Sequence, residues 1–318
     1  MPRNPEDVNV VVSGAGRSAP GGLRAPGCLA ADIEGWLAVS DTGHDRVLVG
    51  RAVGRSFDVE HVIGRGEPGL ADGSFEEAAF RDPHGLALSE DLLIVADRGN
   101  HAVRMIDLRS KEVHTMAGTG EPPEVAIQAG GDPLATPLHS PWDVLLWDYD
   151  LFVAMAGTGE VWRLDLRDRT LSLHAPHTQN GESREAKAMA LATDGHGLYV
   201  ADAAADSIRR IPFEPEGGEV ETLAGSGDDH GDLRGPAGLA WGQGNHRLWI
   251  ADSGHDRLRM LEPGTRNVET VEPFEARLDG PTGLASAGHL LFVADTGHDR
   301  VIRVDQIDKR VTELAVEL

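Results

Sequence analysis

The chain has 318 residues and a formal net charge of −23, from 52 acidic against 29 basic residues. A surface of that sign repels phosphate backbones and anionic headgroups, so we expect no nucleic acid and no membrane as partner. Cys28 is the only cysteine, which excludes an internal disulfide, a Cys-x-x-Cys redox pair and a thiolate zinc site.

The first 22 residues contain a short apolar strand at 8–12 and a glycine-rich stretch, GAGRSAPGG, at 14–22. This stretch joins two β segments and opens no helix, so it is interpreted as a loop and not as a phosphate cradle. No apolar run is long enough for a signal peptide or for the ~20 residues of a membrane helix. With Met1 as the natural start, we expect a soluble cytoplasmic protein.

A short motif then recurs six times along the chain. The copies are VSDTGHDRV from Val39, VADRGNHAV from Val95, VAMAGTGEV from Val153, VADAAADSI from Val200, IADSGHDRL from Ile250 and VADTGHDRV from Val293. Each follows an element that resembles Pro-x-Gly-Leu, at 25–30, 82–87, 140–145, 185–190, 235–240 and 280–285. Each precedes an alternating strand such as EVHTMAGTG from Glu112. One unit therefore holds four short strands.

Alternation of apolar and polar residues, with turns between the runs, predicts antiparallel four-stranded sheets. One such sheet cannot bury its apolar face alone, whereas radial stacking covers each face with the next sheet. The sequence therefore predicts an all-β, six-bladed propeller as a single domain over 1–318. The blades are expected at about 23–64, 80–118, 138–175, 187–225, 234–272 and 278–316. Either the strand at 8–12 or the one at Val311–Val316 forms the outer edge of the closing blade.

An aspartate follows the second strand in five units: Asp41, Asp97, Asp202, Asp252 and Asp295. An aspartate before a glycine-containing turn accepts backbone N–H bonds, so a structural role is favoured. Met155 replaces it in the third unit, whose turn must be held differently. His44, His255 and His298 share one repeat position on separate blades. Zinc needs ligands at about 2.0 Å from a common point, so turn packing is favoured over a metal site.

Candidate ligand-binding residues lie where each innermost strand enters the central channel. The residue after the proline position is Gly27, His84, Trp142, Lys187, Ala237 or Thr282, and it varies from blade to blade. A scaffold needs no such variety, so His84, Trp142, Lys187 and Thr282, with the adjacent Asp143, are predicted to carry ligand specificity.

Arginine precedes the proline position by two residues in four units, as Arg24, Arg81, Arg184 and Arg234. These residues are expected on the same face as the aspartate turns, because successive strands are antiparallel. Ion pairing with the turn aspartates is the simple explanation. The alternative is a basic collar at the channel mouth that holds a carboxylate or phosphate through the guanidinium fork.

The chain resembles the NHL-repeat propeller family, named for an Asn-His pair in this turn, here Asn100-His101. The segments from Gly69 and Ser140 are similar to the propeller part of proteins that join a thioredoxin-like domain to an NHL propeller. The resemblance covers essentially the whole chain, which lacks the thioredoxin-like half. It implies a six-bladed ring and, as one option, an accessory subunit for a separate thioredoxin-like redox partner.

Three functions are weighed. The favoured one is a non-catalytic scaffold that presents its channel-mouth face and the long loops Arg65–Phe80 and Glu121–Leu138 to another protein or a small anionic ligand. The second is a metal-dependent lyase or lactonase-type hydrolase, which needs several convergent ligands where only His84 and Asp143 stand out. The third is the redox accessory subunit. No catalytic residue, metal site or cofactor is predicted.

Overall fold

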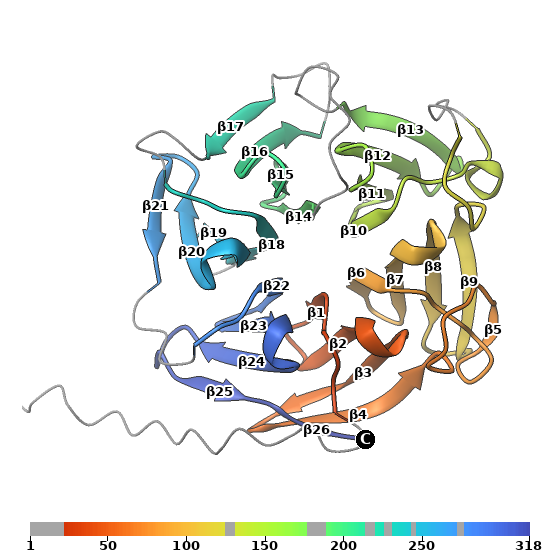
Figure 1. Cartoon of the computed structure of the whole chain (residues 1–318), viewed down its shortest axis with the longest axis horizontal. Helices are drawn as coiled ribbons and strands as arrows, with labels where there is room; N and C mark the ends of the chain where they lie inside the picture. The colour runs from red at the N-terminus through yellow and green to blue at the C-terminus, as the bar shows by residue number, and fades with distance from the viewer. Residues whose placement is uncertain are drawn as a thin grey trace, which may run out of the picture.

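The computed structural model describes residues 22–124, 131–176, 189–213, 220–225, 231–242, 246–271 and 277–318. Six antiparallel sheets stand around a central axis (Figure 1), which confirms the predicted six-bladed propeller. The innermost strands of the six blades are β1, β6, β10, β14, β18 and β22. Among the described residues, no helix is long and apolar enough to cross a membrane.

Blades 1 to 3 follow the repeat in chain order. Blade 1 contains β1 (Leu29–Ala31), β2 (Trp36–Asp41), β3 (Arg46–Val53) and β4 (Ser56–Ile63). Blade 2 contains β6 (Pro83–Ser89), β7 (Leu92–Asp97), β8 (Ala102–Asp107) and β9 (Glu112–Ala117), with the short β5 (Gly73–Ser74) added beside β9. Blade 3 contains β10 (Pro141–Trp147), β11 (Asp150–Met155), β12 (Glu160–Asp165) and β13 (Thr170–Ala175).

Blades 4 to 6 repeat the same order. Blade 4 contains β14 (Met189–Thr193), β15 (Gly197–Asp202), β16 (Ser207–Pro212) and β17 (Glu221–Ala224). Blade 5 contains β18 (Pro236–Gly242), β19 (Arg247–Asp252), β20 (Arg257–Glu262) and β21 (Asn267–Thr270). Blade 6 contains β22 (Pro281–Ala287), β23 (Leu290–Asp295), β24 (Arg300–Asp305) and β25 (Val311–Glu313), and β26 (Ala315–Glu317) follows it.

The C-terminal segment joins the last blade to the first. Strand β25 completes blade 6, and β26 then pairs in parallel with β4 of blade 1, with Ala315 opposite Ser56. The predicted strand at 311–316 therefore divides between the two blades that close the ring. The predicted strand at 8–12 lies outside the described residues.

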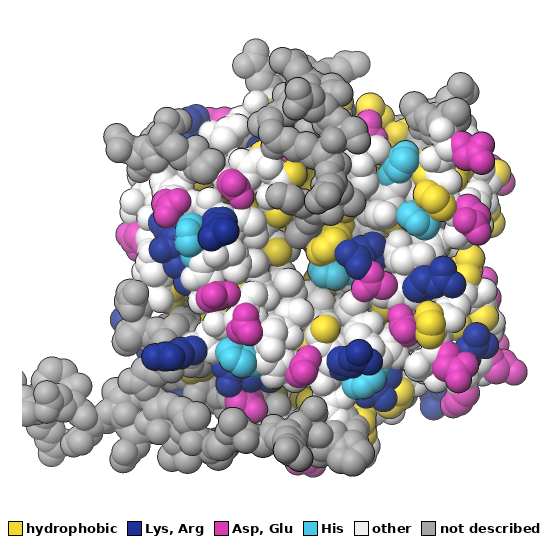
Figure 2. Space-filling view, in the orientation of Figure 1, with side chains coloured by type: hydrophobic (Ala, Val, Ile, Leu, Met, Phe, Trp, Pro, Cys, Tyr) yellow, Lys and Arg dark blue, Asp and Glu magenta, His cyan; other side chains and the backbone are white. Residues whose placement is uncertain are grey.

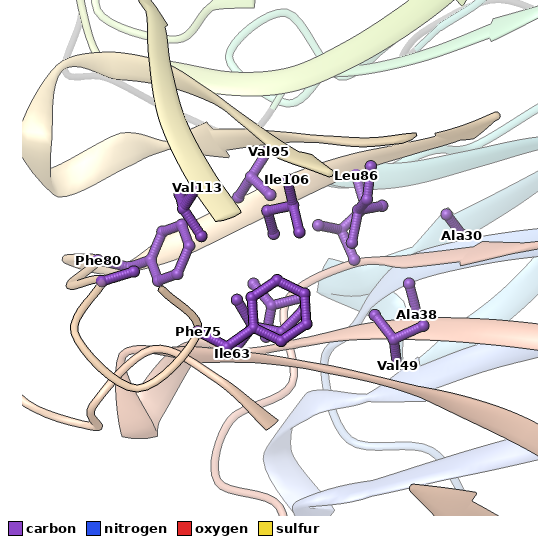
Figure 3. Packing of buried hydrophobic residues seen from close by; sticks show 13 residues of the cluster. Ala30, Ala38, Val49, Ile63, Phe75, Phe80, Leu86, Val95, Ile106 and Val113 are labelled. Atoms are coloured by element: carbon purple, nitrogen blue, oxygen red, sulfur yellow. The ribbon is translucent and has the colours of Figure 1, made fainter. Parts of the chain in front are cut away.

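The hydrophobic core lies between neighbouring blades. Figure 3 shows this packing for blades 1 and 2, where Val49 and Ile63 face Val95 and Ile106. The long loop Arg65–Phe80 adds the buried Phe80 to the same cluster. Arg104, fully buried, fixes this loop by donating to the carbonyl oxygens of Ala71 and Ala79. The loop predicted to be presented to a partner thus exposes its first residues and also contributes to the core.

Each aspartate turn ties the second strand of a blade to the segment before its first strand. Asp41 accepts the backbone N–H of Arg24 at 2.7 Å, and its second oxygen accepts Arg46 Nε at 2.7 Å. Equivalent backbone bonds reach Asp97, Asp252 and Asp295. The cation that pairs with the aspartate comes from the third strand, as Arg46, Arg104, Arg257 and Arg300. In blade 6, Asp279 stands where other blades have arginine, and its backbone N–H donates the same bond to Asp295. This contact therefore does not require an arginine side chain.

The residue that ends each turn staples its blade to the next one. Asp45, at a positive φ of 50°, accepts the backbone N–H of Asp82 at 2.7 Å, and Asp299 accepts that of Ala25 at 2.6 Å across the closure. Asp206 and Asp256 act likewise. In blade 2 His101 Nδ1 contacts Ser140 N at 3.2 Å. In the Asn-His pair, His101 therefore forms the staple to blade 3, whereas Asn100 donates to Asp97 of its own turn at 2.8 Å.

Candidate functional site

The innermost strands enclose a channel cavity of about 360 Å³. Figure 2 shows its opening at the centre of the face that carries the aspartate turns, with apolar and histidine side chains at the rim. His84, Trp142, Asp143 and Thr282 all line this cavity. The structure thus places four of the predicted channel residues around one space.

Close contact between innermost strands explains the glycine of the Pro-x-Gly-Leu element. A Cβ on Gly85 would lie 2.3 Å from Asp143 Cα, and a Cβ on Gly283 would lie 2.6 Å from Cys28 Cα. Real Cβ atoms do not approach backbone atoms this closely, so each glycine makes room for the strand of the next blade. Cys28 and Asp143 themselves occupy the glycine position of their own blades, which places a thiol and a carboxyl group in the channel wall.

The residues after the prolines pack against each other around the mouth. Thr282 Oγ1 donates to the carbonyl oxygen of Gly27 at 2.7 Å. A Cβ on Gly27 would lie 2.8 Å from His84 Cδ2, so the absence of a side chain there admits the imidazole. The His84 ring in turn packs against the Trp142 ring, with centroids 4.4 Å apart and ring planes tilted by 45°. Thr282 is committed to this packing, whereas His84 and Trp142 present rings to the channel.

His84 is buried, and one of its two ring nitrogens has no hydrogen-bond partner among the described residues. The residue is 6 % exposed, and burial lowers its pKa to about 4, which keeps the imidazole neutral at physiological pH. Neither His84 Nδ1 nor Trp142 Nε1 has a hydrogen-bond partner among the described residues. A buried polar nitrogen without a protein partner can be satisfied by a water molecule or by a bound group.

Asp143 holds its carboxyl group against the fourth blade. Its oxygens accept the backbone N–H groups of Val144 at 2.9 Å and of Leu191 at 2.8 Å. The residue is 7 % exposed and forms no ion pair within the described part of the chain. Burial raises its pKa to about 7, so the group is divided between acid and carboxylate near neutral pH.

Cys28 was not singled out by the sequence, yet its side chain lines the same cavity. It lies deep in the protein, and part of its surface faces the channel. Burial and then the charge of Asp143 raise the pKa of this thiol, so it stays protonated at neutral pH. The thiol contacts the carbonyl oxygen of Leu29 at 3.7 Å. Cys28 is therefore a neutral, unreactive wall residue.

Arg98 is a mouth residue that sequence reasoning missed. Its guanidinium lies 4.7 Å from the Trp142 ring centroid and pairs with Asp82. The same turn position holds Thr42, Ser253 and Thr296 elsewhere, and these hydroxyls donate to the proline carbonyl of the next blade. The replacement of a small hydroxyl by arginine at this position was the available signal.

The predicted arginine collar divides into described and undescribed members. Arg24, Arg81 and Arg234 are exposed on the turn face. Their stems pack over the turn glycines Gly43, Gly99 and Gly254. Arg184 and Lys187 lie outside the described residues. Binding of an anion by the collar stays a prediction.

The repeated histidines take the turn role expected from the sequence. His44, His255 and His298 each place Nδ1 against the aspartate of their own turn, at 2.9, 3.1 and 2.9 Å. No group of three His, Cys, Asp or Glu side chains within the described ranges could hold a metal ion. In blade 3, where Met155 replaces the aspartate, Gly157 N donates to the His139 carbonyl and Gly159 N to that of Met155.

Comparison with known proteins agrees with the repeat. The NHL repeat family model matches residues 80–104, which include Asn100-His101. NHL repeat-containing protein 2 of Bos taurus is 31 % identical over 301 residues, covering 79 % of this chain and 40 % of that protein. The Arabidopsis thaliana protein SUPPRESSOR OF QUENCHING 1, chloroplastic, is 31 % identical over 286 residues, covering 80 % and 26 %. The chain thus spans two fifths or less of these relatives.

Solved structures share the fold at low sequence identity. A streptogramin B lyase has a TM-score of 0.59 and 14 % identity, over 92 % of this chain and 84 % of that one. A nidogen/laminin complex has a TM-score of 0.59 and 16 % identity, over 90 % of this chain and 92 % of that one. A putative gluconolactonase has a TM-score of 0.59 and 16 % identity, over 92 % of this chain and 91 % of that one. Enzymes and a binding complex both appear, so this likeness establishes the propeller alone.

Proposed function

Because this chain is an NHL-repeat six-bladed β-propeller, we propose that it is a binding scaffold that receives a partner group at the channel mouth between blades 2 and 3. One observation carries the proposal: His84 Nδ1 and Trp142 Nε1 are buried beside the cavity without a partner among the described residues. A buried polar group without a hydrogen bond costs about 1–3 kcal/mol of stability. A bound partner can offset this cost if the two rings turn and hydrogen-bond to it.

The equivalent positions of other blades support this choice. Gly27, Ala237 and Thr282 fill the same place with small side chains, and Thr282 satisfies its hydroxyl within the ring. The scaffold can therefore be built without an imidazole and an indole. Their presence, with Arg98 above the indole, concentrates adaptable recognition groups on one sector of the mouth.

The two alternatives have less support. A lyase or lactonase role draws on the fold shared with the streptogramin B lyase and the gluconolactonase, at 14 % and 16 % identity. A role beside a thioredoxin-like partner draws on the family resemblance. The cytoplasmic location stays a prediction, and one relative is named as chloroplastic.

Affinity capture from a lysate of the source organism tests the proposal. The wild-type chain is compared with Trp142→Ala and with Tyr149→Ala, an exposed aromatic in the turn after β10, at the other end of that strand. We expect a stoichiometric partner that Trp142→Ala loses and Tyr149→Ala retains. Retention by a folded Trp142→Ala chain would refute the mouth as the binding site.

A further inference from the structure

Asp143 contributes a buried carboxyl group to a channel wall that also contains leucine and valine side chains from every blade. We propose that the channel binds an organic monocation, an alkylammonium group whose nitrogen pairs with Asp143 while its apolar body packs on the channel walls. This inference rests on the proposed binding function and names its ligand class. The group can come from a free amine or from the lysine side chain of a partner.

Asp143 has unused capacity for such a donor. A carboxylate offers about four lone-pair directions, and the backbone N–H groups of Val144 and Leu191 use two of them. Both of these donors are neutral. A buried carboxylate without a cation is costly, so a positive ligand at this position gains more than it would at the surface.

The walls fit the apolar part of the ligand. The cavity is lined from all six innermost strands by Leu29, Leu86, Val144, Leu191, Leu239 and Leu284. The volume of about 360 Å³ lies at the small end of ligand pockets, which suits a compact molecule. The rings of His84 and Trp142 at the mouth add surfaces that attract a cation as it enters.

Charge favours a cation over an anion here. The net charge of −23 raises the local concentration of positive ligands. Arg98, the mouth cation, already pairs with Asp82, and a carboxylate ligand deeper in the channel would meet Asp143. The anionic ligand considered from the sequence would therefore have to remain outside, near the exposed arginines.

The groups that face Asp143 set the pH dependence. Cys28 of blade 1 is a protonated thiol and His84 of blade 2 is a neutral imidazole near pH 7. Asp143 is then the one described channel group that titrates in this range, because burial raises its pKa to about 7. Cation affinity should rise as pH increases through that value.

Calorimetric titration with n-butylammonium, 1-butanol and butyrate at pH 8 tests the ligand class. We expect n-butylammonium to bind and the alcohol and the carboxylate to bind at least about tenfold more weakly, the contribution of a charged hydrogen bond. Asp143→Asn should lose the preference, whereas Asp308→Asn, which removes an exposed charge, should keep it. Equal binding of alcohol and amine to the wild type would overturn the proposal, whether or not Asp143→Asn folds.

One further titration identifies the source of the cation. Nα-acetyl-lysine methylamide distinguishes the sources, since comparable binding favours a partner lysine and exclusion favours a free amine. Loss of cation preference with partner capture still dependent on Trp142 would reject this inference and leave the proposed function standing.

Discussion

Two buried aspartates, Asp97 in a blade turn and Asp143 in the channel wall, show how the propeller separates structure from recognition. Asp97 accepts Arg104 Nη1, Asn100 Nδ2 and the backbone N–H of Arg81, all at 2.8 Å. Asp143 accepts two backbone N–H groups and has no ion pair among the described residues. The hydrogen-bonding capacity of Asp97 is filled by neighbouring protein groups, whereas Asp143 keeps capacity to bind a ligand.

The same contrast extends to the surroundings of both residues. The turn recurs with the same contacts in blades 1, 2, 5 and 6, and its staple crosses the closure between blades 6 and 1. The channel residues depart from the repeat at His84, Arg98, Trp142 and Asp143 on blades 2 and 3, and at Cys28 on blade 1. Repetition builds the ring, and departures from it mark the candidate site.

Removal of the turn carboxylate should give the largest effect. Asp97→Ala leaves the fully buried Arg104 without its buried counter-ion and should lower the free energy of unfolding by about 3–5 kcal/mol. Denaturant unfolding measures this change, with the exposed Asp308→Ala as control. A loss below about 1 kcal/mol would show that the turn does not need its ion pair.

The Asp143 carboxyl should instead make the free energy of unfolding depend on pH. Burial raises the pKa of Asp143 from 3.8 to about 7, so the stability it contributes is complete below about pH 4 and is lost as pH rises through 7. Relative to Asp143→Asn, the wild type should lose up to about 4 kcal/mol between those limits. Unfolding across pH tests this, and both chains retain His84, whose lowered pKa acts with the opposite sign. A difference that is flat with pH would contradict it.

Strand contact around the axis predicts a smaller penalty. Gly85→Ala places a Cβ at 2.3 Å from Asp143 Cα and should cost about 1–3 kcal/mol through displacement of β10. Gly264→Ala is the matched control, because a Cβ there meets nothing within 4 Å. Equal stability of the two variants would mean that the innermost strands are not in close contact.

The mouth arginine should contribute least to stability. Arg98→Ser restores the hydroxyl type of the equivalent Ser253 and removes a partly exposed pair and a cation–π contact, each worth about 1 kcal/mol or less. Thermal unfolding should change little while partner capture falls. A loss of more than about 2 kcal/mol would identify Arg98 as part of the scaffold.

The sequence predicted the ring because six copies of one motif define its period, and each copy carries its own turn residues. It also located His84, Trp142 and Asp143, because they vary where every innermost strand enters the channel. It missed Cys28 and Arg98, since a glycine-position cysteine and a turn arginine look ordinary until neighbouring blades are in contact.

Side-chain direction explains the remaining differences. The turn aspartates were expected to pair with Arg24 and its equivalents, but those residues supply backbone N–H groups and the guanidinium comes from the third strand. The loop Arg65–Phe80 was expected to be presented to a partner; it begins with exposed residues, and its second half is also anchored by Arg104 and the core. The spacing of motifs in the sequence predicts which segments lie close together, but not which of their atoms are in contact.

The most direct test reverts the departures to residues that other blades already use, as Arg98→Ser, Trp142→Thr and Asp143→Gly in one chain, followed by the capture measurement. We predict a cooperatively folded propeller that no longer retains the partner. Undiminished capture by the folded triple variant would contradict the claim that these departures form the binding site.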